Sequence, residues 1–204
     1  MDRREHWEQV YRTRQPTEVS WYARHLTDSL RLIREVAPLS ARIIDVGSGA
    51  STLVDDLLDA GYRRVTVLDI SATALAHART RLAEHGADVT WIQADVTSAA
   101  LADAAYDLWH DRAVFHFLTE ESERRAYMQT LQRKLKPTGY VVIGTFSLSG
   151  PERCSGLDVV RYDAAALQRE LGPGFALTAS EEPVHITPGG KQQRFVLCRF
   201  QRIL

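Results

Sequence analysis

The chain has 204 residues, 45% of them hydrophobic, and this length and composition suit one globular domain with a sizeable core. The formal net charge of −1 gives no broad basic field that would attract nucleic acid or a membrane surface, and no apolar run could span a bilayer. Two cysteines, Cys154 and Cys198, without zinc-type spacing indicate neither a disulfide scaffold nor a metal site, and the charged N-terminus is not a secretory signal, so we expect a reduced, cytoplasmic protein.

The first forty residues precede the first buried strand and are predicted to form a helical cap on a single domain over residues 41–204. Four aromatic residues gather there: Trp7, Tyr11, Trp21 and Tyr22. Such rings can anchor a helix to a domain, and their faces can also attract a cation, so both roles stay open. Trp21 and Tyr22 follow the turn-like segment "RQPTE", and we expect them to line a pocket, Trp21 at a cofactor and Tyr22 at a substrate.

From Arg42 onward, short apolar runs alternate with segments of helical periodicity. Strands are predicted at 42–46, 63–70, 88–96 and 106–111, and residues 135–146 are predicted to form a turn that leads into a fifth strand. Helices are predicted at 52–60, 71–86, 119–135 and 163–171. Ser71 and Thr119 are the predicted N-caps of two of these helices. Two last strands, 175–185 and 194–200, flank the hairpin signal "TPGGK".

This alternation implies parallel strands joined through right-handed crossovers. We therefore predict an α/β fold: a doubly wound, Rossmann-like, mostly parallel seven-stranded sheet with helices on both faces. The C-terminal hairpin adds antiparallel pairing, and the N-terminal helices form the cap.

The stretch "RIIDVGSGAST" runs from an apolar strand into a turn that contains Gly47 and Gly49. These glycines allow a sharp bend and a close approach to a ligand at the carboxyl edge of the sheet. Asp45 stands two residues before Gly47, where a carboxylate would repel a pyrophosphate but would suit a cationic aminoacyl group. Thr52 occupies the third glycine position of the dinucleotide fingerprint, so that fingerprint fails.

Two further acids end predicted strands. Asp69, followed by Ile70, closes the second strand and could accept hydrogen bonds from ribose hydroxyls. Asp95, followed by Val96, ends the third strand and could bind an adenine amino group.

With these motifs in order, the chain resembles the class I S-adenosylmethionine-dependent methyltransferases. "IIDVGSGAS", "VTVLDIS", "WIQADV", "YDLWHDRA" and "LKPTGYVVI" follow one another as in that family, with Ser51 replacing the last glycine of the first motif. The resemblance implies S-adenosyl-L-methionine as the cofactor. It implies that Asp45, Gly47 and Gly49 hold the methionine end, Asp69 with Ile70 the ribose, and Asp95 with Val96 the adenine. His110 and Asp111 would line the mouth at the methyl donor.

The segment "HDRAVFHFLTEESERRAYMQTL" partly resembles thiopurine-type methyltransferases, which act on small thiols and related chalcogen compounds. That likeness implies that Arg112 reaches towards an anionic substrate group or the cofactor. Related protein-lysine methyltransferases carry "DKGT" where this chain has "DRAV", so a small-molecule acceptor is favoured, and a protein lysine stays the alternative.

Several candidates remain for the chemistry and for substrate contact. His110, Asp111, Arg112 and His116 are the catalytic candidates, although His116, among phenylalanines, fits a packed histidine bonded to backbone at least as well. The glycine-containing loop after the fifth strand is predicted to be a mobile lid that offers Arg153, Cys154, Arg161 and Tyr162. His185 is expected in the core or on the surface.

Two functions of other classes stay open: a nicotinamide-dependent oxidoreductase, which Asp45 and Thr52 disfavour, and a non-catalytic adenosyl-binding partner subunit. The expected partner is a small-molecule substrate, with no nucleic acid and no membrane. We expect a monomer or a homodimer.

Overall fold

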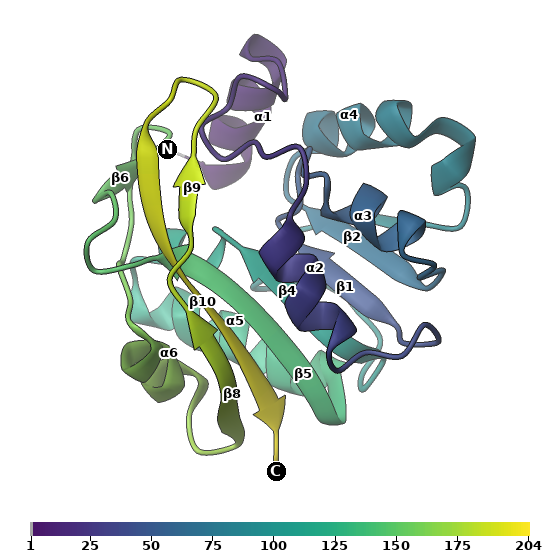
Figure 1. Cartoon of the computed structure of the whole chain (residues 1–204), viewed down its shortest axis with the longest axis vertical. Coiled ribbons are helices and arrows are strands. Elements are labelled where there is room, and N and C mark those ends of the chain that lie inside the picture. Colours follow the sequence, from purple (N-terminus) through teal and green to yellow (C-terminus); the bar gives the residue numbers. More distant parts are fainter. Residues whose placement is uncertain (1) are drawn as a thin grey trace.

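A mixed β-sheet forms the centre of the computed structural model, which describes residues 2–204 (Figure 1). Its strands are β1 (Ile43–Val46), β2 (Val65–Asp69), β3 (Thr90–Gln93), β4 (Tyr106–Arg112), β5 (Leu135–Phe146), β8 (Phe175–Glu181), β9 (Val184–Ile186) and β10 (Gln192–Arg202). The order across the sheet is β3-β2-β1-β4-β5-β10-β8, with β9 paired to a separate stretch of β10. β1 to β5 pair in parallel, and β10 is antiparallel to β5, β8 and β9. The predicted fold is confirmed.

Helices cover both faces of this sheet. They are α1 (Arg3–Thr13), α2 (Thr27–Arg34), α3 (Leu53–Asp59), α4 (Ala72–Leu82), α5 (Glu121–Lys134) and α6 (Ala164–Leu171). Apolar residues of α2, α3 and α4 pack with one side of the strands in one buried cluster, and those of α5 and α6 pack with the other side in a second cluster. Because successive residues of a strand point to opposite faces, Ile43 joins the first cluster and Ile44 the second.

Helix α1 lies next to the carboxyl ends of the parallel strands. The carboxylate of Glu8 accepts hydrogen bonds from the Ala72 N–H at 2.5 Å and from the Thr73 hydroxyl at 2.6 Å, at the start of α4. Arg3 donates to Glu123 of α5 at 2.5 Å. An N-terminal helix was expected, and these long-range bonds fix it over the edge of the sheet where ligands bind in α/β folds.

Local signals set most element boundaries, but two predictions were wrong. Ser71 caps α4 as predicted, since its hydroxyl accepts from the Ala74 N–H at 3.1 Å. Thr119, however, is not a cap: α5 begins at Glu121, and Glu120 holds the N-cap position without a side-chain cap bond. The strand expected over 175–185 is broken into β8 and β9, because Pro183 between them has no N–H for the ladder.

The loop after β5 contains a small two-stranded hairpin, β6 (Arg153–Cys154) with β7 (Leu157–Asp158). Its two turn residues, Ser155 and Gly156, both have positive φ (51° and 82°), as a tight hairpin turn requires. The sequence did not predict these strands.

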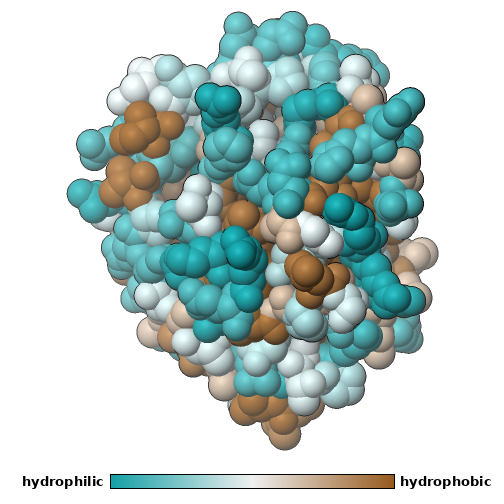
Figure 2. Space-filling model, turned by 45° about the vertical axis from the view of Figure 1, so that its right-hand side comes forward, coloured by the Kyte–Doolittle hydropathy of each residue, from teal (hydrophilic) through white to brown (hydrophobic). Residues whose placement is uncertain are grey.

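The face shown in Figure 2 is mostly hydrophilic, with hydrophobic side chains in small separated groups. Within residues 2–204, no helix is long and apolar enough to cross a membrane. In the same range no group of three or more histidine, cysteine or acidic side chains could hold a metal ion.

Candidate functional site

The turn after β1 depends on its two glycines. Gly47 and Gly49 have φ of +59° and +53°, a backbone region that side chains with a Cβ rarely adopt. A Cβ on Gly47 would lie 1.8 Å from Cγ2 of Val114, and one on Gly49 would lie 2.3 Å from the hydroxyl of Tyr11. Both positions therefore need glycine for conformation and for space, as predicted from the sequence.

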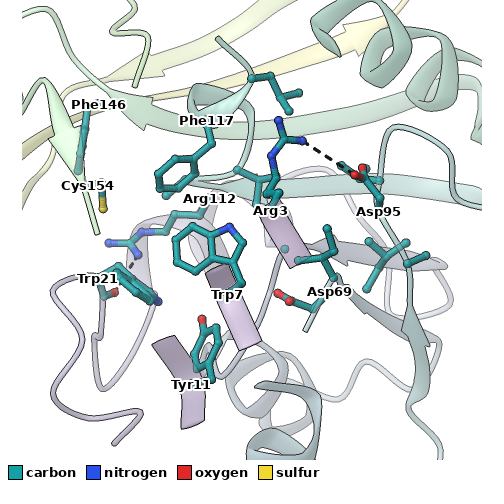
Figure 3. A pocket seen from close by; sticks show the side chains of 18 of the residues that line it. Arg3, Trp7, Tyr11, Trp21, Asp69, Asp95, Arg112, Phe117, Phe146 and Cys154 are labelled. Atoms are coloured by element: carbon teal, nitrogen blue, oxygen red, sulfur yellow. Dashed lines mark hydrogen bonds and ion pairs between the residues drawn. The ribbon is translucent and has the colours of Figure 1, made fainter. Parts of the chain in front are cut away.

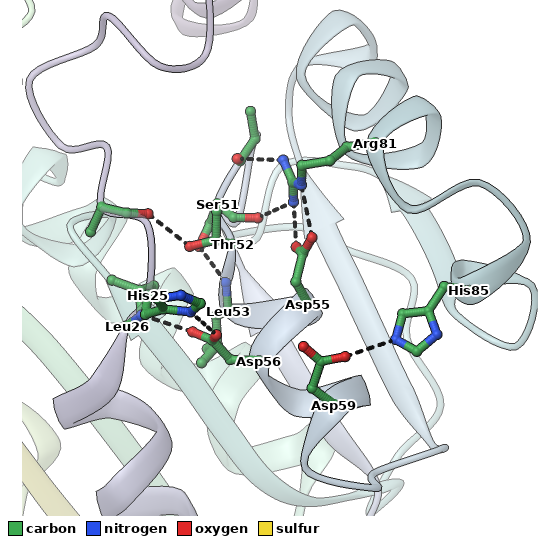
Figure 4. A network of polar contacts seen from close by, with 12 residues as sticks. His25, Leu26, Ser51, Thr52, Leu53, Asp55, Asp56, Asp59, Arg81 and His85 are labelled. Carbon is green, nitrogen blue, oxygen red and sulfur yellow. Dashed lines mark hydrogen bonds and ion pairs between the residues drawn. The ribbon is translucent and has the colours of Figure 1, made fainter.

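Polar contacts from other elements hold this turn in place (Figure 4). Arg81 of α4 donates to the carbonyls of Ala50 at 3.0 Å and Ser51 at 2.6 Å, and its guanidinium also pairs with Asp55 of α3 at 2.6 Å. The Thr52 hydroxyl donates to the Ala23 carbonyl at 2.9 Å, which ties the N-terminal segment to the turn. The turn is thus preorganised before any ligand arrives.

A buried chain of three polar residues lies beside the turn. The Nδ1–H of His110 donates to Oδ1 of Asp45 at 2.6 Å, and Nε2 of His110 is 2.9 Å from the Ser29 hydroxyl. Oδ2 of Asp45 and the hydroxyl of Ser48 are buried without a hydrogen-bond partner among the described residues. Buried polar atoms in native proteins are nearly always satisfied, so these two groups point to a missing polar ligand.

Asp45, Ser48 and His110 line one cavity together with Trp21 and Tyr22. This cavity lies on the α2 and α3 side of the turn, and it continues past Trp21, Gly47 and Arg112, which also line the next cavity.

The second cavity, with a volume of about 90 Å³, extends from the ends of β2 and β3 to a group of aromatic rings (Figure 3). Its polar end contains Asp69, Ile70, Asp95 and Val96, so the structure brings these four predicted residues to one place. One oxygen of Asp69 accepts from the Ser71 N–H at 2.8 Å. Burial raises the pKa of Asp69 to about 7. Hydrogen bonds from the Ser71 and Gly49 N–H groups lower this pKa, but burial has the larger effect.

Asp95 is held by its own turn. Its Oδ1 accepts from the backbone N–H and the hydroxyl of Thr97, at 2.8 and 2.7 Å. Its Oδ2 lies 3.9 Å from the Arg3 guanidinium of α1, which also lines the cavity. Asp95 therefore presents a fixed carboxylate edge at the tip of β3.

The other end of the cavity is aromatic. Trp7 contacts Trp21 and Phe117 edge to face, with ring centroids 5.6 and 5.1 Å apart. Tyr11 joins this group beside Trp21. Phe146, Cys154 and Phe195 complete the wall, and burial raises the pKa of the Cys154 thiol to about 11, so the thiol stays protonated near neutral pH.

Arg112 stands where the cavities meet. It donates to the Trp21 carbonyl at 3.1 Å, and its guanidinium carbon lies 4.7 Å from the centre of the Phe195 ring. No carboxylate among residues 2–204 forms an ion pair with it, and burial lowers its pKa to about 10. The guanidinium remains charged at neutral pH and has donors left for a ligand.

Two catalytic candidates lie outside these cavities. Asp111 accepts from the Tyr127 hydroxyl at 2.7 Å and the Val114 N–H at 3.0 Å, on the α5 side of the sheet. It follows His110 directly in β4, so the two side chains must point to opposite faces. His116 is fully buried, and its Nδ1 accepts from the Phe146 N–H at 3.2 Å. Burial, and then the charge of Arg112, lower the pKa of His116 to about 3, so its ring is neutral.

Three substrate candidates from the loop after β5 also lie away from the cavities. Arg153 pairs with Asp158 at 2.9 Å within the β6–β7 hairpin, and Arg161 pairs with Glu152 at 2.9 Å. Tyr162 is buried against Phe115 in the core. Of that loop's candidates, only Cys154 lines a cavity.

Sequence reasoning missed several residues that line the cavities, namely Arg3, Val114, Phe146 and Phe195. Arg3 lies in a charged helix, and the other three read as core residues of apolar segments. Only their positions next to strand ends could have indicated a site.

The chain is similar to known methyltransferases in sequence and in fold. The family described as a methyltransferase domain matches residues 43–139. The eEF1A lysine and N-terminal methyltransferase of Danio rerio is 28% identical over 119 residues, which are 58% of this chain and 17% of that protein. The matched region spans 17% of this Danio rerio protein and 20% of its Bos taurus counterpart, so the chain corresponds to only about a fifth of these curated relatives.

Solved structures show the same fold across nearly the whole chain. An S-adenosylmethionine-dependent methyltransferase from Anabaena variabilis superposes with a TM-score of 0.77 at 16% identity, covering 99% of this chain and 96% of that one. A second solved structure is described by the conversion of a disulfide bond into a thioacetal group during echinomycin biosynthesis. It superposes with a TM-score of 0.76 at 20% identity, covering 97% of this chain and 91% of that one.

Proposed function

We propose that the chain is a class I S-adenosylmethionine-dependent methyltransferase that methylates a small molecule, with a thiol or another chalcogen as the accepting atom. The cavity of Asp45 and Ser48 is the observation that carries the cofactor part of this proposal. The acceptor part rests on the position of α1 over the edge of the sheet and on the partial likeness of the segment after β4 to thiopurine-type enzymes.

The residues present fit S-adenosyl-L-methionine. The free Oδ2 of Asp45 and the Ser48 hydroxyl are buried groups that suit the ammonium and carboxylate of its aminoacyl end. Asp69 would accept from the ribose hydroxyls, with Ile70 beside it, and Asp95 with Val96 would bind the adenine. A pyrophosphate at the Gly47 turn would meet the Asp45 carboxylate, which disfavours a nicotinamide cofactor.

When bound, the cofactor supplies an electrophilic methyl group on a sulfonium. What the protein must add is alignment of the nucleophile and exclusion of water. The rings of Trp7, Trp21 and Phe117 close one end of the cavity, and the face of an aromatic ring attracts a cationic sulfur. Arg112 would hold an anionic group of the acceptor or the cofactor carboxylate. His116 is packed and neutral, so we assign it no proton transfer.

A small acceptor fits the closure of this site better than a protein side chain. Helix α1 lies over the edge of the sheet, fastened through Glu8 and Arg3, and so covers the side from which a large acceptor would approach. The echinomycin neighbour, by its description, works at sulfur, which supports a chalcogen acceptor. The eEF1A methyltransferase relatives support the second candidate, a protein lysine.

Two measurements test the proposal. Calorimetric titration with S-adenosylhomocysteine should show one site per chain, whereas tight binding of reduced nicotinamide cofactor in its place would refute the assignment. Incubation with methyl-labelled S-adenosylmethionine and a cell lysate should then place the label in small metabolites. Label in proteins would favour the lysine alternative, and no turnover with a broad acceptor panel would favour a non-catalytic partner subunit. We expect this activity from a monomer or homodimer in a reducing cytoplasm.

A further inference from the structure

A third cavity opens at the ends of β4 and β5, and the cofactor assignment leaves it without a role. Its volume is about 200 Å³, room for on the order of ten water molecules. The start of α2, the β9 strand and the β10 strand form its walls. It shares Arg112 with both cofactor cavities and Phe195 with the aromatic one, so it adjoins the place where an acceptor must react.

Two opposite charges line this cavity without a partner. Arg112 uses one donor on the Trp21 carbonyl and forms no ion pair with a carboxylate of the described chain. Asp28, exposed in the first turn of α2, makes neither a hydrogen bond nor an ion pair within residues 2–204. Since both line the same cavity and do not pair, their charged atoms lie more than 4.0 Å apart.

Three other polar side chains of the cavity are already engaged. His25 pairs with Asp56 at 2.7 Å, the Ser29 hydroxyl bonds His110, and Nε2 of His185 bonds the Ser20 carbonyl at 2.8 Å. The cavity therefore offers a ligand one partly buried cation, Arg112, and one exposed anion, Asp28, beside an apolar wall that includes Phe195 and Leu197.

Resting on the proposed function, we infer that the acceptor is a zwitterionic molecule of the amino-acid type. Its carboxylate would bind Arg112 and its ammonium would bind Asp28, while its side chain would pass Phe195 towards the methyl donor. A ligand with only a negative charge would bind Arg112 but would form no ion pair with Asp28. A ligand with only a positive charge would bind Asp28 but would have no carboxylate for the Arg112 guanidinium. Charge complementarity of this kind selects partners by penalising the wrong charge pattern.

Three small thiols separate these possibilities: L-cysteine carries both charges, 3-mercaptopropionate lacks the ammonium and cysteamine lacks the carboxylate. Each is titrated, under reducing conditions, into protein saturated with S-adenosylhomocysteine, so that the methionine subsite is blocked. We expect L-cysteine to bind about tenfold more tightly than either analogue, the scale of one charge-assisted hydrogen bond. Equal binding of the three, or no binding of L-cysteine, overturns the inference.

The variant Asp28→Asn should remove the advantage of L-cysteine over 3-mercaptopropionate and leave the affinity for S-adenosylhomocysteine unchanged. Asp59→Asn on α3, whose side chain is 72% exposed, is the matched control and should change neither affinity. A weaker affinity for S-adenosylhomocysteine in Asp28→Asn would assign Asp28 to the cofactor site and overturn the inference. Failure of the unchanged protein to bind S-adenosylhomocysteine would instead refute the proposed function, so the two failures are distinguishable.

Discussion

Asp45 and His110 lie directly opposite each other on the neighbouring parallel strands β1 and β4, and the Nδ1–H of His110 donates to Oδ1 of Asp45 across 2.6 Å. This bond orients the carboxylate so that Oδ2 is the atom left free at the Gly47 turn. The imidazole is itself held by Ser29 of α2. Both ring nitrogens of His110 are thus engaged, and we propose that His110 positions Asp45 as a ligand for the cofactor.

Replacing His110 by phenylalanine should weaken cofactor binding. The change keeps a ring in the buried space but leaves Oδ1 of Asp45 without its donor, at a cost of about 1–3 kcal/mol. We expect the Kd for S-adenosylhomocysteine to rise about tenfold in calorimetric titration. Ser29→Ala, which removes only the outer bond, should have a smaller effect. An unchanged Kd in the phenylalanine variant would mean that Asp45 does not contact the cofactor.

Cofactor binding should depend on pH through Asp69. Burial raises the pKa of this carboxyl to about 7 in the unliganded protein, and ribose hydroxyls bind best to the ionised form. Affinity for S-adenosylhomocysteine should therefore fall as pH drops below about 7 and level off above it. Asp69→Asn should bind more weakly and lose this dependence, and a wild-type Kd that is flat between about pH 6 and pH 8 would contradict the role.

The raised pKa of Asp69 should also make the stability of the unliganded protein depend on pH. The folded state binds this proton more tightly than the unfolded state, whose carboxyl keeps its ordinary low pKa. The contribution of Asp69 to stability is therefore present at acid pH and is lost as pH rises towards about 7. Thermal unfolding of the wild type and Asp69→Asn across this range measures it, and the difference between the two should grow with pH.

Gly47→Ala should destabilise the protein and abolish cofactor binding. The new methyl group would overlap Cγ2 of Val114 at 1.8 Å, and the residue would keep a φ of +59°. We expect a loss of about 2–4 kcal/mol, from overpacking together with the left-handed backbone. Gly190→Ala in the β9–β10 hairpin is the control: its φ is +78° with nothing within 4 Å of a Cβ, so it should cost about 1–2 kcal/mol and leave binding intact.

The sequence predicted the sheet, and it predicted which acidic residues lie at the carboxyl edge of its strands, because both follow from local patterns. Strand ends in a parallel sheet share one edge, so ordered motifs placed Asp45, Asp69 and Asp95 together. The sequence could also have predicted the side-chain directions in β4. Successive residues of a strand point to opposite faces, so only one of His110 and Asp111 can face the Gly47 turn, although both were expected there.

The remainder of the site depends on contacts between distant segments. No local pattern indicates that β9 brings His185 to the Ser20 carbonyl. The third cavity arises in the same way, because the start of α2 meets two C-terminal strands that are more than 150 residues away in the chain. The ion pairs of Arg153 with Asp158 and of Arg161 with Glu152, by contrast, are local to the loop after β5, and they engage two residues that were expected to contact a substrate.

A last prediction separates the structural role of Asp111 from a catalytic one. The Trp109 indole N–H donates to the Tyr127 hydroxyl at 2.9 Å, and this hydroxyl donates to Asp111, all within the core on the α5 side. Tyr127→Phe removes both bonds and leaves a buried carboxyl with fewer donors, so unfolding should become easier by about 1–3 kcal/mol.

Because Asp111 lines none of the cavities that contain Arg112, this variant should keep the wild-type KM for the acceptor and the wild-type Kd for S-adenosylhomocysteine at a temperature where both proteins are folded. Chemical denaturation measures the loss of stability. Steady-state kinetics measures KM and kcat, and calorimetric titration measures the Kd for S-adenosylhomocysteine. A large fall in kcat without a fall in stability would show that Asp111 acts on the reacting atoms, against its position in the core.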